Sequence, residues 1–114
     1  MMGTQRNLNR VLTLEVRRGE SDGAGGRSEV WTPLGTLWAE MKAGSGRDTS
    51  GEASRLSHVP WRIYVRGAPY GSPERPRAGQ RFREGARIYV IRAVAEADAR
   101  GAFLTCHAEE EIVL

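Results

Sequence analysis

The chain has 114 residues, a formal net charge of +3, 39% hydrophobic residues and a single cysteine. This size is typical of one domain, which can bury a core without disulfides or metal. No apolar run approaches the ~18 residues of a membrane span, and residues 1–6 lack the apolar centre of a signal peptide. A lone cysteine excludes an internal disulfide and fits a reducing compartment. We therefore expect a single domain over residues 1–114, made in the cytoplasm and without a membrane partner.

Arginine supplies most of the positive charge, because Lys42 is the one lysine among 17 basic residues. A basic chain can serve anionic partners such as nucleic acid. These arginines are scattered, however, and an Arg-, Gly- and Ala-rich composition is also typical of GC-rich genomes. The acidic run at residues 109–111 is expected to be a solvated strand end.

The first half predicts two strands separated by a loop. After a flexible N-terminus over residues 1–7, Leu12, Leu14 and Val16 alternate with polar residues and predict a half-buried strand over residues 8–17. Four glycines within residues 18–28 predict a mobile loop. A second strand over residues 29–41 is interrupted by Pro33 and Gly35, which predict a bend or bulge near a sheet edge.

A long polar segment follows over residues 42–58, and loops of this length are usually functional or disordered. Thr49 with Glu52 could form the capping box of one short helix that ends near Ser57. Residues 59–66 then alternate as a strand, and residues 67–79 hold three prolines and three glycines, which predict an irregular linker.

Two further strands end the chain. Residues 88–94 are apolar on both faces, with Tyr89, Ile91 and Ala93 expected to share one face, so this strand is central or covered. After a turn at residues 98–101, Leu104, Cys106 and Ala108 line one face. The sequence therefore predicts an all-β fold, a small β-barrel or sandwich of five to six strands with long loops.

Catalytic and cofactor signatures are weak in this chain. The glycines at residues 23–26 lack the Lys-Ser or Lys-Thr of a phosphate-binding loop. Cys106 and His107 are adjacent on a strand and point to opposite faces, so they cannot easily share a metal ion with His58. Cys106 is better explained as a packing residue than as a nucleophile. We expect no enzyme activity, no metal and no cofactor.

The three tryptophans allow two interpretations. Trp31, Trp38 and Trp61 could stack on bases, as in barrels that bind single strands. They could also supply buried area in the core or at a subunit interface, which we favour for a domain of this size.

Several segments together resemble the phage head–tail joining family. These segments are Leu8-Asn9-Arg10, Glu29-Val30-Trp31, Leu37-Trp38-Ala39-Glu40, Ser45-Gly46-Arg47-Asp48, Arg62-Ile63-Tyr64-Val65-Arg66, residues 85–91 and the turn at residues 98–100. The resemblance covers roughly residues 8–110. It implies a head-closure or stopper protein of long-tailed phages or phage-like gene transfer agents, a small β-barrel that forms rings of six or twelve copies. Such a ring lies between the portal and adaptor rings on the head side and the tail proteins on the other side. It retains packaged double-stranded DNA without reading its sequence.

This resemblance suggests a role for the long polar segment. Its length and polarity suit a loop that docks on a neighbouring ring or projects into the DNA channel, where repeated copies reinforce one another. We hypothesise that the docking or gating residues are Gly44, Ser45, Gly46, Arg47 and Asp48.

A rival function is an oligonucleotide-binding β-barrel. Arg62, Tyr64 and Arg66 share one strand face and, with Trp61 and Arg87, could form a basic aromatic surface. The first three residues could instead face a neighbouring subunit, solvent or the DNA in the channel.

Overall fold

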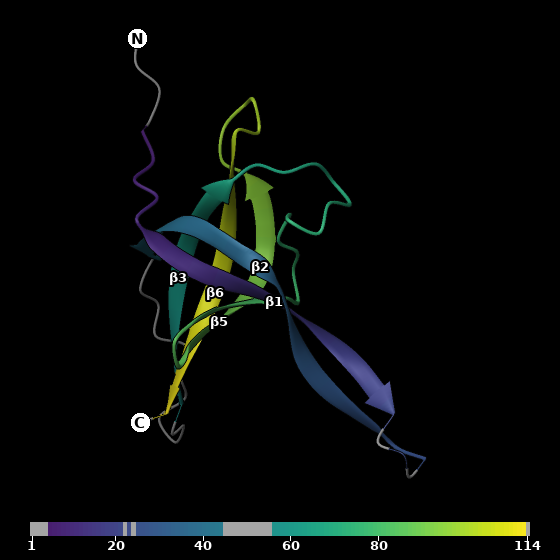
Figure 1. Cartoon of the computed structure of the whole chain (residues 1–114). Coiled ribbons are helices and arrows are strands. Elements are labelled where there is room, and N and C mark those ends of the chain that lie inside the picture. Colours follow the sequence, from purple (N-terminus) through teal and green to yellow (C-terminus); the bar gives the residue numbers. More distant parts are fainter. Residues whose placement is uncertain (1–4, 22, 24, 45–55, 114) are drawn as a thin grey trace.

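The protein folds as a closed antiparallel β-barrel from which one long hairpin projects (Figure 1). The computed structural model describes residues 5–21, 23, 25–44 and 56–113. The strands follow one another around the barrel in the order β1-β2-β3-β6-β5-β4. This confirms the all-β prediction, and no helix occurs in the described ranges. The strands are β1 (Arg10–Ser21), β2 (Arg27–Ala43), β3 (Leu56–Arg66), β4 (Arg81–Glu84), β5 (Arg87–Glu96) and β6 (Phe103–Val113).

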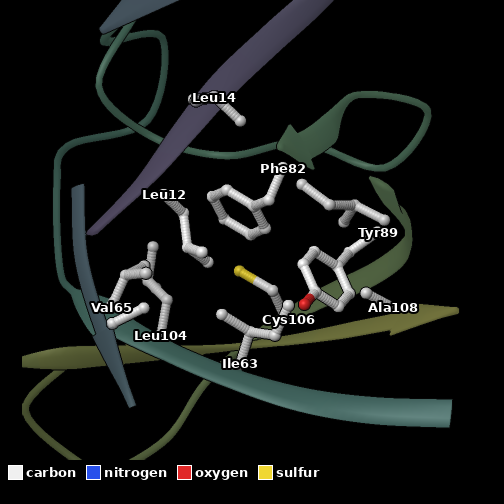
Figure 2. Close-up of a cluster of buried hydrophobic side chains, with 11 residues drawn as sticks. Leu12, Leu14, Ile63, Val65, Phe82, Tyr89, Leu104, Cys106 and Ala108 are labelled. Atoms are coloured by element: carbon white, nitrogen blue, oxygen red, sulfur yellow. The ribbon is translucent and has the colours of Figure 1, made fainter. Parts of the chain in front are cut away.

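Alternating side chains from all six strands fill the barrel interior, as strand geometry requires. Tyr89 and Phe82 are the largest fully buried side chains, and the Trp61 ring meets Tyr89 edge to face at 6.2 Å between centroids. Burial of each large side chain contributes about 1.5–3 kcal/mol. Cys106 lies among them, which confirms its predicted packing role (Figure 2). The cluster consists of Leu12, Leu14, Ala39, Ile63, Val65, Phe82, Tyr89, Ile91, Leu104, Cys106 and Ala108.

A β-bulge interrupts β2 where the sequence predicted a bend. Leu14 pairs with Gly35 and Glu15 pairs with Pro33, so Leu34 is an extra residue without a partner on β1. The prediction from the proline and glycine is confirmed. A bulge increases local twist, and beyond this point the two strands leave the barrel wall (Figure 1).

A second bulge lies in β5. Ile91 pairs with Ala108 and Ala93 pairs with His107, which leaves Arg92 as the extra residue. The register therefore shifts, and Ala93 is exposed. The prediction that Ala93 shares the buried face of Tyr89 and Ile91 is wrong for this reason.

The predicted loop over residues 18–28 is mostly strand. β1 continues to Ser21 and β2 begins at Arg27, so the connection between them is short. Gly23 and Gly25 have positive φ values of 80° and 83°, which suits the turn of a hairpin. The glycine content led to a predicted loop that is too long. In the folded hairpin, hydrogen bonds between β1 and β2 offset the entropy cost of ordering the glycines.

The predicted loop over residues 42–58 is shorter at both ends. β2 runs to Ala43, β3 begins at Leu56, and Ser57 lies in β3 rather than near a helix end. Thr49 and Glu52, the proposed capping box, lie outside the described residues. Residues 67–80 contain no strand, as predicted for the irregular linker.

Part of the N-terminus predicted as flexible is held against the barrel. The Glu40 carboxylate accepts hydrogen bonds from the Arg6 guanidinium at 3.1 Å and from the Asn7 backbone N–H at 3.0 Å. Residues 5–9 therefore continue along β2, where the Asn9 N–H also donates to the Ala39 carbonyl.

Candidate functional site

The outer face of β3 carries the basic aromatic residues that the sequence singled out. Ile63 and Val65 point into the core, so Arg62, Tyr64 and Arg66 share the outward side, as predicted. Both arginines are exposed, but Tyr64 is only 8% exposed. The Arg6 guanidinium covers its ring at 3.7 Å. This cation–π contact leaves little of the ring free to stack on a base.

The other two residues of the proposed oligonucleotide surface are engaged elsewhere. The Trp61 indole N–H donates to Glu110 at 3.1 Å. The Arg87 guanidinium donates to both oxygens of Glu110 at 2.7 and 2.9 Å. The five residues therefore do not form one free basic aromatic surface, and the geometry does not support the oligonucleotide-binding alternative.

Glu110 itself is buried, with only 5% of its surface exposed. Its hydrogen bond with Arg87 outweighs burial and lowers the pKa of the Glu110 carboxyl. The prediction of a solvated acidic end is therefore wrong at this position, because β6 turns Glu110 toward Arg87 and Trp61. Glu109 faces the other way and pairs with Arg92 at 2.9 Å, where both side chains are partly exposed.

A second buried carboxylate joins β1 to β4. Glu15 is 4% exposed and accepts hydrogen bonds from Arg81 at 2.7 Å and Arg83 at 2.9 Å. Burial alone would raise the pKa of Glu15, but the two arginines lower it overall. Local alternation in β1 does not reveal this contact, since the partners of Glu15 lie far along the chain.

A third pair closes one end of the barrel. Arg10 and Glu84 form an ion pair, with a second hydrogen bond between them at 3.0 Å. This hydrogen bond lowers the pKa of Glu84 against the opposing effect of burial. Together with the other pairs, it shows that much of the arginine content neutralises carboxylates of the same chain. The paired arginines are Arg6, Arg10, Arg17, Arg81, Arg83, Arg87 and Arg92.

We call the projecting hairpin, residues 16–21 and 27–32, the arm. It contains six residue pairs, from Val16↔Thr32 to Ser21↔Arg27, and at about 3.3 Å per residue it extends roughly 20 Å. β4 pairs with β1 only up to Glu15, and β3 pairs with β2 only from Ala39 onward. Among the described residues, neither outer edge of the arm therefore has a strand partner.

The base of the arm is fixed by cations stacked on an indole ring. The guanidinium of Arg81 lies 4.1 Å from the centroid of Trp31, and that of Arg17 lies 5.8 Å from it. Because Arg81 also binds Glu15, the arm is tied to the barrel by contacts that set its direction. Neither Trp31 nor Trp61 belongs to the buried core cluster, although Trp61 packs against it.

Only one of the five proposed docking residues can be placed. The Gly44 N–H donates to the Pro60 carbonyl at 2.9 Å, and a Cβ there would lie 3.0 Å from the Pro60 Cβ. Ser45, Gly46, Arg47 and Asp48 lie outside the described residues, so their docking or gating role stays a prediction.

Groups suited to catalysis or metal binding are sparse in the described part of the chain. No cluster of three or more His, Cys, Asp or Glu that could hold a metal occurs within the described residues. Cys106 is buried, and its burial raises the pKa of the thiol to about 12, which disfavours the reactive thiolate. Among the described segments, no helix is long and apolar enough to cross a membrane.

An open hollow of about 530 Å³ lies where β2 ends. Gly44, Pro60 and Trp61 line it together with charged residues of both signs, including Arg92 and Glu109. Arg92 and Glu109 already pair with each other, which leaves Arg62 and His107 as the other polar side chains of the hollow.

Comparisons with known proteins connect this chain with proteins of phage and gene transfer agent particles. A chain in a solved structure described as "Virion of native gene transfer agent (GTA) particle" is similar over 96% of this chain and 100% of its own length. It has 51% sequence identity and a TM-score of 0.83. A search among curated proteins found no match. The family model "Phage head completion protein" matches residues 4–111, and the chain belongs to this family of virion proteins.

Proposed function

We propose that this chain is a head-closure, or stopper, protein that forms a ring in the neck of a phage-like particle. Its family and the gene transfer agent virion chain that it resembles support a structural task. The observation that carries the proposal is the arm, a hairpin with two unpartnered strand edges on an otherwise closed barrel. An enzyme is disfavoured because nothing in the described surface converges as catalytic groups do.

The arm supplies what a ring contact requires. A closed barrel has no strand edges of its own, whereas the arm can add a strand to, or accept one from, a neighbouring subunit. A two-stranded ribbon alone is at best marginally stable in water, so an assembly partner would stabilise it. Contacts between different surfaces of identical copies generate a ring when the rotation closes. Six or twelve copies would each repeat the contact and strengthen it.

The ring would bind portal or adaptor proteins on the head side and tail proteins on the other side. Double-stranded DNA would pass through its channel without sequence recognition. Internal ion pairs already use much of the arginine charge, so contacts with DNA would be few and nonspecific.

The segment Gly44 to Asp48 remains our proposed docking or gating element. Its first residue, Gly44, follows β2 and donates a hydrogen bond to the Pro60 carbonyl. Deletion of residues 44–50 should leave the folded barrel intact, as judged by circular dichroism, and abolish neck assembly or DNA retention. Normal yields of filled, tailed particles from that deletion would contradict this role.

We predict that the purified chain is monomeric in the absence of the other neck proteins, because the arm forms contacts with neighbouring subunits only on assembly. Light scattering on the purified protein measures this directly. A stable ring in the absence of other components would contradict the prediction.

Removal of the gene tests the proposed function. Electron microscopy of the producing cells' lysate should show free tails beside heads that are empty or leak DNA. A plasmid copy of the wild-type gene should restore tailed particles. Intact tailed particles without the gene product would exclude the head-closure role.

A further inference from the structure

A row of outward-facing residues crosses four strands at the barrel end where β3 finishes. Val11 pairs with Trp38, and Arg66 pairs with Phe103. Trp38 and Arg66 are the residues next to the paired Ala39 and Val65, so the two pairs continue one row around the barrel. We call Val11, Trp38, Arg66 and Phe103 the outer band.

Three of the four band residues are apolar, and all but the half-buried Phe103 are exposed. Val11 is 45% exposed and Trp38 is 58% exposed, although both lie on regular strands. Arg66 is exposed, and its guanidinium lies 6.0 Å from the Phe103 ring. No ion pair joins Arg66 to a carboxylate of the described residues, in contrast to the paired arginines around it. The neighbouring cation Arg6 is already neutralised by Glu40.

This arrangement specifies the chemistry of a partner. Exposed Trp and Arg side chains are the residues most often found at interface hot spots, and an apolar band beside them is covered by apolar groups. An unpaired guanidinium between two aromatic residues accepts a carboxylate in a bidentate manner. We propose that the outer band docks a segment of another virion protein that presents an apolar side chain next to a carboxylate. This inference rests on the proposed role in neck assembly.

Charge distinguishes this partner from two alternatives. The arm of a second copy and its turn contain Arg17, Arg18 and Arg27 against Glu20, Asp22 and Glu29, so the hairpin has no net negative charge to complement Arg66. DNA would use a row of cations on its phosphates and would not cover a valine and a tryptophan. An acidic, partly apolar protein segment satisfies both halves of the band.

Photo-crosslinking in assembled particles identifies the occupant. A chain with the photoreactive residue p-benzoylphenylalanine in place of Trp38 is supplied to cells that lack the gene, and irradiated particles are analysed by mass spectrometry. The same residue in place of Val11 provides a second probe, and in place of Tyr70, which is 82% exposed on the 67–80 segment, it provides the control. The band probes should crosslink to an acidic segment of another virion protein, and the control should not.

Crosslinks from the band to DNA or to a second copy would overturn the proposal, as would particles that contain the chain without any band crosslink. Arg66→Glu should lower the yield of tailed particles about tenfold or more, as expected for a hot-spot residue. Arg77→Glu, at an exposed arginine outside the band, should leave the yield unchanged. Equal yields from both variants would also contradict the band.

These results separate the inference from the proposed function. If loss of the whole gene leaves tailed particles intact, the head-closure role fails. If loss of the gene abolishes them while Arg66→Glu supports normal yields, the role stands and the outer band is not the docking surface.

Discussion

The adjacent residues Glu109 and Glu110 give a matched test of what holds the barrel together. Each carboxylate binds an arginine on β5, but Glu110 is 5% exposed and accepts three hydrogen bonds, whereas the side chain of Glu109 is 35% exposed. Glu110→Ala leaves the Arg87 guanidinium and the Trp61 N–H without their acceptor. Truncating one member of a buried pair costs as much as 3–5 kcal/mol, roughly, when the other charge stays buried.

Arg87 limits this cost because its side chain is 45% exposed and can regain water. Charge-assisted hydrogen bonds contribute about 1.5–3 kcal/mol, so we expect Glu110→Ala to lower the free energy of unfolding by about 2 kcal/mol. Glu109→Ala removes an exposed pair and should cost about 0.5 kcal/mol. For a domain of this size, the first change corresponds to a fall in Tm of about 10 °C.

Far-UV circular dichroism during urea and thermal unfolding measures both variants without relying on the fluorescence of Trp61, which the mutation itself perturbs. A cost for Glu110→Ala no larger than that for Glu109→Ala would refute the conclusion that burial makes the Glu110 network important for stability.

Three further predictions follow from the same structure. Arg87 holds the pKa of Glu110 below its ordinary value. The pair therefore stabilises the fold fully above the unfolded-state pKa of about 4.3 and loses that stabilisation as pH falls through the folded-state pKa. The urea midpoint should drop on acidification, and less so in Glu110→Gln. Gly67→Ala should lower the Tm more than Gly44→Ala. A Cβ added at Gly67 would lie 2.1 Å from the Gly101 carbonyl oxygen, whereas a Cβ added at Gly44 would lie 3.0 Å from its nearest atom. The opposite order would show that the backbone at Gly67 can shift at little cost. The buried Cys106 thiol, with its pKa raised to about 12, should react with Ellman's reagent only after denaturation, and rapid labelling of the native protein would contradict its packing.

Local patterns predicted the barrel core well. Alternation placed Leu12, Leu14, Leu104 and Cys106 inside. It could do so because the two-residue period of a strand is visible within a short stretch of sequence. Pro33 and Gly35 predicted the bulge for a similar reason.

Other features depend on partners distant in sequence and were not predictable from local patterns. Part of the arm was predicted to be a loop from the glycine content of residues 18–28. Its strands form by pairing across the hairpin, which the local composition does not show. The buried contact of Glu15 could not be predicted, because Arg81 and Arg83 are far along the chain. Tyr64 was considered free because nothing in its own strand shows that Arg6 covers it. Trp38 has the same alternation as a solvent-facing residue, and only its exposure in the folded barrel identifies the outer band.

In vitro complementation tests the head-closure account most directly. Purified wild-type protein is added to a lysate of cells that lack the gene, and tailed particles are counted by electron microscopy while nuclease-resistant DNA is measured in parallel. We predict that the added protein joins heads to tails and raises the amount of protected DNA, with saturation at a fixed ratio of protein to heads. Tailed particles and protected DNA that do not depend on the added protein would contradict the account.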